Sequence, residues 1–216
     1  MELVSKIENI DCMEFMGQFP DNFFDLAVVD PPYGINMDGG KIGGDNCSKS
    51  KKYTKKQWDQ EPPQIEYFKE VFRISKNQII WGANHFISRI PFDSSCWIVW
   101  DKENTGNFAD CELAWTSFKT AVRKFEFRWN GMLQGNMKDK EIRIHPTQKP
   151  VALYDWIFSN YAEQGMKILD THLGSGSSRI SADKCKMNFW GCELDKEYFE
   201  AHEKRWKQYK AQLSLF

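Results

Sequence analysis

The sequence has no Cys-x-x-Cys pair, and its four histidines show no spacing typical of metal ligands. It also lacks a secretion signal and any apolar run long enough to span a membrane. Six cysteines without paired spacing and without a secretion signal are typical of reduced thiols. We therefore expect a cytoplasmic protein that holds no metal.

Charge of one sign is not in excess either, because 29 Lys and Arg stand against 30 Asp and Glu, for a formal net charge of -1. A uniformly basic surface is excluded, so any contact with nucleic acid depends on local patches. Repeats and low-complexity segments are absent as well. With 216 residues, the chain is expected to form one domain over residues 1–216, with a sizeable core.

The tetrapeptide Asp30-Pro31-Pro32-Tyr33 combines a carboxylate, a rigid backbone and an aromatic ring. The preceding residues 24–29 are mostly apolar, as in a buried strand, and the two prolines end that strand. A carboxylate at the end of a strand lies where open α/β sheets bind ligands. Asp30 and the Pro31 carbonyl are suited to accept the two N–H groups of a flat amine, while Tyr33 stacks on it. A plain Pro-Pro turn after a strand is the other interpretation.

A second pattern, from Asp170 to Glu193, is typical of a nucleotide site. A strand over residues 167–170 leads into a glycine turn, a helix follows, and the next strand ends at Glu193. An acid at that strand end is placed to bind ribose hydroxyls. Position 179, where a dinucleotide motif has its third glycine, is Arg179, so a nucleoside without phosphates fits better. S-adenosylmethionine (AdoMet) is such a nucleoside, and bridging groups would link its ammonium to Asp170.

Strands alternate with helices along the chain, which predicts an α/β fold with a mostly parallel, doubly wound sheet of Rossmann-like type. The glycine-turn strand comes late in the chain, whereas a complete nucleotide-binding sheet begins with it. We therefore predict a circularly permuted order, in which the strand within residues 1–11 lies beside the strand over 189–193. The strand over 167–170 then lies beside the strand over 24–29, so that the cofactor and amine sites share one edge.

Three motifs in this order resemble those of the β-class DNA amino-methyltransferases: Asp30 to Tyr33, His145-Pro146-Thr147-Gln148-Lys149-Pro150, and Asp170-Thr171-His172-Leu173-Gly174-Ser175-Gly176-Ser177. The resemblance covers nearly the whole chain, and residues 97–118 are similar to the small phage and prophage members. It implies an AdoMet-dependent methyltransferase fold and methylation of an exocyclic amine in DNA. Asp at the first position of the tetrapeptide is usual in adenine N6 enzymes, and Ser is commoner in cytosine N4 enzymes.

The resemblance also implies roles for individual residues. It places a flipped target adenine at the catalytic residues Asp30, Pro31, Pro32 and Tyr33. It places the cofactor at Asp11, Thr147, Lys149, Asp170, His172, Gly174, Ser175 and Gly176, and the nucleotide pattern adds Glu193. His172 departs from the family, which often has Phe there, so a polar ring must take that position.

Two polar segments, residues 34–60 and 119–144, are expected to be loops that contact double-stranded DNA. The candidate phosphate contacts are Lys49, Lys51, Lys52, Lys55, Lys56, Arg123, Lys124 and Arg128. A solvated loop and a charged edge hairpin are the alternatives for these two segments. By analogy with the family we expect a homodimer, and a place in restriction-modification.

Three other functions remain open on sequence grounds. The first is methylation of another amine, cytosine N4 in DNA or adenine in RNA. The second is a nicotinamide-dependent oxidoreductase, which Arg179 and the tetrapeptide disfavour. The third is a non-catalytic DNA-binding subunit with the same fold, against which the intact Asp30 and glycine turn argue.

Overall fold

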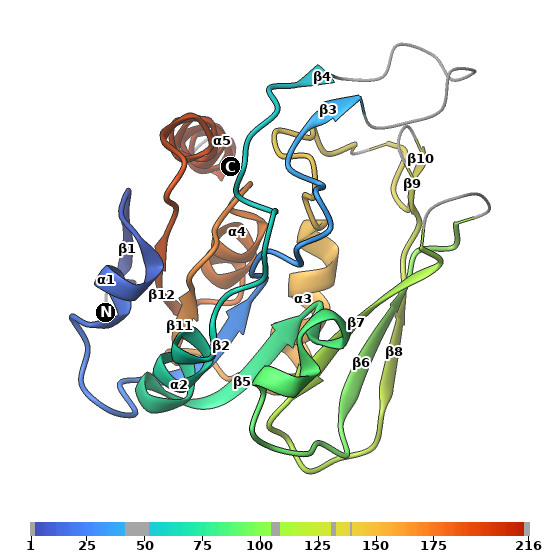
Figure 1. Ribbon diagram of the computed structural model, residues 1–216. Helices are drawn as coiled ribbons and strands as arrows, with labels where there is room; N and C mark the ends of the chain where they lie inside the picture. The colour runs from blue at the N-terminus through green and yellow to red at the C-terminus, as the bar shows by residue number, and fades with distance from the viewer. Residues whose placement is uncertain (1–2, 42–51, 105–108, 131–132, 139, 214–216) are drawn as a thin grey trace.

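A computed structural model describes residues 3–41, 52–104, 109–130, 133–138 and 140–213. Its centre is an eight-stranded sheet (Figure 1). The strand order is β1 (Ser5–Glu8), β12 (Asn188–Cys192), β11 (Lys167–Asp170), β2 (Phe24–Val29), β5 (Ser75–Trp81), β7 (Cys111–Thr116), β6 (Trp97–Asp101) and β8 (Arg123–Glu126). The first five strands of this order run parallel to one another. Strand β7 runs antiparallel to β5 and β6, and β8 is parallel to β6.

The predicted permuted order is confirmed. Strand β12 pairs with β1 on one side and with β11 on the other. Strand β11 in turn pairs with β2, with Leu169 opposite Ala27. Because the carboxyl ends of parallel neighbours meet at one edge, Asp30 and the glycine turn after Asp170 emerge side by side.

Helices cover both faces of the sheet (Figure 1). Helices α1 (Cys12–Met16) and α2 (Ile65–Ile74) pack on the face that carries Ala27 and Val29. Helices α3 (Val151–Tyr161) and α4 (Ser177–Lys184) pack on the face that carries Leu26 and Val28. Strand β2 therefore buries side chains in both directions, which explains its nearly continuous apolar run. Helix α5 (Lys196–Leu213) lies over α4 through contacts of Arg179 with Trp206 and of Asp183 with Tyr209.

Several boundaries differ from the predicted ones. The first strand ends at Glu8, and Asp11 caps α1 by accepting the N–H groups of Met13 and Glu14 at 2.8 and 3.3 Å. Strand β8 occupies residues 123–126 of the segment 119–144 that was expected to be a loop. The polar segment 34–60 contains the paired strands β3 (Gly40–Lys41) and β4 (Lys52–Tyr53). Segment 119–144 likewise contains β9 (Trp129–Asn130) and β10 (Leu133–Gln134).

Two short 3-10 turns, η1 (Ala83–His85) and η2 (Ile87–Arg89), follow β5. Gly82 precedes η1, and its φ of 69° is left-handed. A Cβ at this glycine would lie 2.0 Å from the ring of Tyr33. Gly82 therefore gives the tetrapeptide Asp30 to Tyr33 room against the sheet. No helix in the described ranges is both long enough and apolar enough to cross a membrane.

Candidate active site

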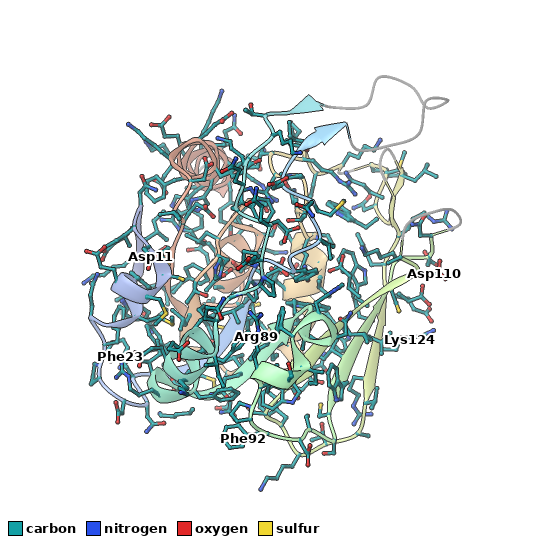
Figure 2. The ribbon with its side chains drawn as sticks, viewed as in Figure 1. Asp11, Phe23, Arg89, Phe92, Asp110 and Lys124 are labelled. Atoms are coloured by element: carbon teal, nitrogen blue, oxygen red, sulfur yellow. The ribbon has the colours of Figure 1, made fainter. Side chains whose placement is uncertain are left out.

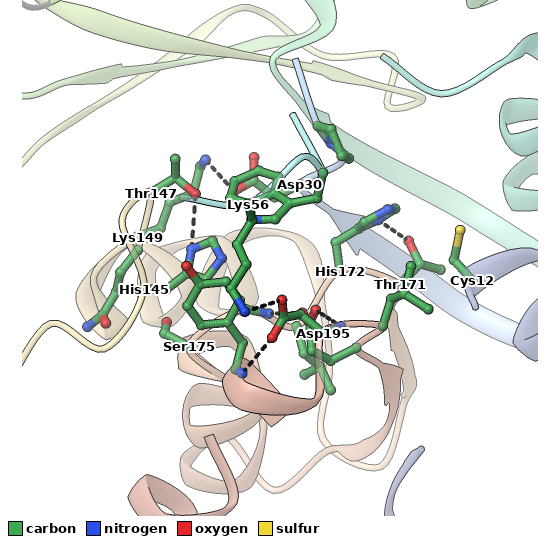
Figure 3. A pocket seen from close by; sticks show the side chains of 18 of the residues that line it. Cys12, Asp30, Lys56, His145, Thr147, Lys149, Thr171, His172, Ser175 and Asp195 are labelled. Carbon is green, nitrogen blue, oxygen red and sulfur yellow. Dashed lines mark hydrogen bonds and ion pairs between the residues drawn. The ribbon is translucent and has the colours of Figure 1, made fainter. Parts of the chain in front are cut away.

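A pocket of about 590 Å³ opens at the carboxyl edge of β2, β11 and β12 (Figure 3). Most of the predicted catalytic and cofactor residues line it: Asp11, Asp30, Pro32, Thr147, Lys149, His172, Gly174, Ser175 and Glu193. Four predicted site residues are not part of its lining, namely Pro31, Tyr33, Asp170 and Gly176. The Asp30 strand end and the glycine turn thus open into one cavity.

The glycine turn is held from behind by Asp170, which is 2 % exposed. Its carboxylate accepts the backbone N–H of His172 at 3.0 Å and the hydroxyl of Ser178 at 2.5 Å. Burial raises the pKa of Asp170 to about 7. Gly176 has a φ of 70° and faces α5, since a Cβ there would lie 2.0 Å from the ring of His202. Both residues therefore shape the turn and do not form its pocket face.

Glu193 forms the acidic end of the pocket. One of its carboxylate oxygens accepts the N–H of Gly174 at 2.8 Å, and the other accepts the N–H of Asp195 at 2.9 Å. Each oxygen keeps a second lone pair, so the carboxylate is fixed in place and still able to accept bonds from hydroxyl groups.

His172 contributes a neutral aromatic ring. Burial lowers its pKa to about 4. Its Nδ1 lies 3.0 Å from the hydroxyl oxygen of Thr171, and its ring meets that of Tyr67 edge to face, with centroids 5.4 Å apart. An uncharged, ordered ring therefore stands where the family often has Phe.

A short segment after β4 closes the pocket against the start of α5. Lys56 lies 3.0 Å from Asp195 and 2.9 Å from Glu197 (Figure 3). Trp58 stacks on His145, with ring centroids 5.3 Å apart. The indole N–H of Trp58 is buried and has no hydrogen-bond partner among the described residues. The segment thus adds an aromatic wall and one unused donor to the pocket.

At the other end of the pocket Asp30 belongs to a network of charges. The ammonium of Lys149, which is 3 % exposed, lies 2.6 Å from Oδ2 of Asp30 and 2.9 Å from Oε2 of Glu112. The hydroxyl of Tyr33 donates to Oδ1 of Asp30 at 2.7 Å. Lys102 pairs with the second oxygen of Glu112. Both oxygens of the Asp30 carboxylate are therefore fixed by partners.

Burial and the nearby Glu112 carboxylate raise the pKa of Asp30, against the lowering effect of the Lys149 ammonium. Burial also acts to raise the pKa of Glu112, but Lys149 and Lys102 outweigh it and lower that pKa to about 2. Burial acts to lower the pKa of Lys149, and the two carboxylates outweigh it and raise that pKa. Glu112 and Lys149 are thus held in their charged forms.

Two residues of this region were missed by the sequence analysis as parts of the site. Glu112 shares one face of β7 with the buried Ala114 and Thr116. A carboxylate in that alternation is the sequence signal that could have identified it. The other is Asp59, whose carboxylate accepts the N–H groups of Tyr33, Gly34 and Met37 at 2.7 to 2.8 Å. Nothing in the sequence distinguishes Asp59 from other loop acids.

The candidate DNA contacts fall in two parts of the chain, one around β4 and one from β8, which contains Arg123 and Lys124, to Arg128. Lys49 and Lys51 lie outside the described residues, Lys52 is in β4, and Lys55 is exposed. Lys124 is paired with Glu126, and Arg128 lies 3.8 Å from Glu103. Lys124 and Asp11 lie on opposite sides of the molecule (Figure 2). Among the basic candidates whose side chains the structure describes, Lys56 alone lines the pocket.

Comparisons with known proteins agree with this geometry. Residues 47–204 match a family model described as DNA methylase. In an alignment 237 positions long, the chain is 25 % identical to the Type II methyltransferase M2.MboI of Moraxella bovis. The alignment covers 92 % of this chain and 86 % of the relative.

Two solved structures share the fold. One is the crystal structure of the M1.HpyAVI-SAM complex, with a TM-score of 0.58 and 22 % identity, covering 93 % of this chain and 98 % of that chain. The other is PvuII DNA methyltransferase, described as cytosine-N4-specific, with a TM-score of 0.62 and 13 % identity, covering 94 % and 87 %. The predicted α/β fold with its mostly parallel sheet is confirmed.

Proposed function

We propose, since this chain belongs to the N6/N4 DNA methylase family, that it transfers a methyl group from AdoMet to the N6 amine of a flipped adenine in double-stranded DNA. The observation that carries the proposal is the single pocket that receives both Asp30 and the glycine turn from neighbouring strands. Preference for adenine rests on the carboxylate at the first position of the tetrapeptide.

AdoMet is the methyl donor of this family, and the residues of the pocket fit it. A volume of about 590 Å³ is within the range of small-molecule sites. Glu193 would hold the ribose hydroxyls, and Thr147 and Ser175 add hydroxyl groups to the wall. The unused indole N–H of Trp58 is a donor that a bound molecule would satisfy. Among the described residues no cluster of His, Cys, Asp and Glu is arranged to hold a metal ion.

When bound, AdoMet supplies a methyl group activated by a sulfonium. The adenine amine is a poor nucleophile because its lone pair is conjugated with the ring. Asp30 and the Pro31 carbonyl would accept the two amine hydrogens, which favours tetrahedral nitrogen and frees the lone pair. The Asp30 carboxylate would also stabilise the positive charge that grows on the nitrogen. The nitrogen then returns to neutrality by losing a proton to solvent.

The target base has to leave the duplex to reach this pocket. Extruding a base costs a few kcal/mol of pairing and stacking. Tyr33, already stacked on His85 with centroids 5.0 Å apart, is the ring on which we propose that the base stacks. Contacts of exposed basic residues such as Lys55 with phosphates, a second subunit and a role in restriction-modification belong to the same proposal.

Labelled methyl transfer tests the proposal directly. The chain would be incubated with methyl-labelled AdoMet and unmethylated plasmid DNA, and the product digested to nucleosides. The expected product is N6-methyldeoxyadenosine. N4-methyldeoxycytidine would establish instead the alternative that the likeness to the cytosine-N4-specific PvuII enzyme favours. Absence of labelled DNA would support a non-catalytic subunit.

A further inference from the structure

We infer that Glu112 is a positioning residue for the proposed methyl transfer, acting through Lys149. It holds the Lys149 ammonium between two carboxylates, so that the positive charge of Lys149 is offset and does not oppose the charge that develops on the amine of the base. This inference rests on the proposed function and adds to it a group that lies outside the three sequence motifs.

Three elements bring these charges together. Glu112 lies on β7, Lys102 follows β6, and Lys149 precedes α3. In the antiparallel pair of β6 and β7, Trp100 is opposite Glu112, which places Lys102 within reach of the same carboxylate. Glu112 is not part of the pocket lining, whereas Lys149 and Asp30 are. Its influence on a bound base therefore passes through Lys149 and through the hydroxyl of Tyr33, which lies 3.5 Å from Oε2 of Glu112.

The charges in the network balance. Asp30 and Glu112 each carry one negative charge, and Lys149 and Lys102 each carry one positive charge. The amine nitrogen becomes positive as its bond to the methyl carbon forms, so a local excess of positive charge would oppose the reaction. In a buried site such a charge acts more strongly than in water. Without Glu112 the network would carry that excess.

The first test is Glu112→Gln, which keeps the shape of the side chain and an oxygen that accepts from Lys149. Its single-turnover rate of methyl transfer should fall by about 10- to 100-fold, as expected for a lost electrostatic contribution near a developing charge. The dissociation constants for AdoMet and DNA should stay near those of the wild type. Glu163→Gln, at an exposed loop position after α3, is the matched control and should transfer at the wild-type rate.

The double variant Glu112→Gln with Lys102→Gln separates charge from structure. It removes one charge of each sign and restores the balance, so the rate should recover part of the loss. If Glu112 only braces β6 against β7, removing Lys102 as well would not restore the rate. A double variant no faster than Glu112→Gln alone would therefore overturn the inference.

A second readout does not depend on activity. Removing the negative charge of Glu112 should lower the pKa of Asp30. This pKa would be measured from the carboxyl carbon signal of labelled Asp in NMR spectra recorded across pH. The acid limb of the rate should move to lower pH in the same variant. If wild-type protein methylated no DNA, the proposed function would fail while this titration still tested the charge linkage. An unchanged Asp30 titration would overturn the inference, as would a wild-type rate of transfer by Glu112→Gln.

Discussion

The ammonium nitrogen of Lys149 lies 2.6 Å from Oδ2 of Asp30, although 119 positions separate the two residues. The resemblance placed Lys149 on the AdoMet side of the site and Asp30 around the target base. The structure shows that both line one pocket and that Lys149 is the direct ion-pair partner of Asp30. The two halves of the proposed reaction are therefore coupled through one buried charge pair.

Replacing Lys149 by Met should move the acid limb of methyl transfer to higher pH. Lys149 lowers the pKa of Asp30, so its loss leaves two adjacent carboxylates and favours protonated Asp30. Breaking a buried pair on one side should also cost about 3–5 kcal/mol of unfolding free energy. Single-turnover rates between pH 5 and 9 measure the first effect, and an acid limb at the wild-type position would contradict the assigned pairing.

His172→Phe should retain AdoMet binding, because the native ring is already neutral and the family often has Phe there. In the folded protein the pKa of His172 is lowered from 6.5 to about 4, so its contribution to stability is present above pH 6.5 and is lost as pH falls toward 4. The variant should therefore become more stable relative to wild type as pH falls through that range. Urea unfolding at pH 7.5 and 4.5 measures the difference, and an equal difference at both values would refute the neutral ring.

Asp59→Ala should destabilise the protein and slow methyl transfer together. The substitution leaves the N–H groups of Tyr33, Gly34 and Met37 without their acceptor. The expected loss is about 2–4 kcal/mol of unfolding free energy. Asp93→Ala, at an exposed loop position, is the control and should change neither quantity. Wild-type stability of the Asp59 variant would show that the chain after Tyr33 does not depend on this carboxylate.

Lys55 and Lys56 should differ in their effect on DNA binding, although they are adjacent. Lys55 is exposed, and Lys56 is paired with Asp195 and Glu197. Lys55→Gln should reduce the salt slope of DNA affinity by about 0.9, the value for one lost phosphate contact. Lys56→Gln should leave that slope unchanged and weaken AdoMet binding by about two- to fivefold, as for a partly exposed ion pair. The reverse pattern would assign the phosphate contact to Lys56.

Local pattern predicted the parts of the fold that are buried on both sides or strongly periodic. The strand over residues 167–170 has the predicted bounds, because its apolar residues and the following turn define them. The order of β1, β12, β11 and β2 was predicted from the order of the motifs. The placement of β7 between β5 and β6 was not predicted, because strands of similar apolar content do not specify their partners.

The site was predicted to a similar extent. The sequence patterns located Asp30, Gly174 and Glu193, which all line the pocket. Each of the three follows the end of a strand. The contact of Glu112 with Lys102 depends on the pairing of β6 with β7, and the contact of Asp59 with Tyr33 depends on the path of a long polar segment. Such contacts arise from tertiary packing, which local sequence does not encode.

Asp30→Asn gives the most direct test of the account, because it removes the charge of the proposed catalytic carboxylate and keeps its size. AdoMet binding would be measured by calorimetry, and methyl transfer to DNA by single-turnover labelling of the same preparation. The account predicts AdoMet affinity within about threefold of wild type and transfer slowed by about 1000-fold, the upper range for a lost electrostatic group. Transfer at a near wild-type rate by the folded variant would contradict it.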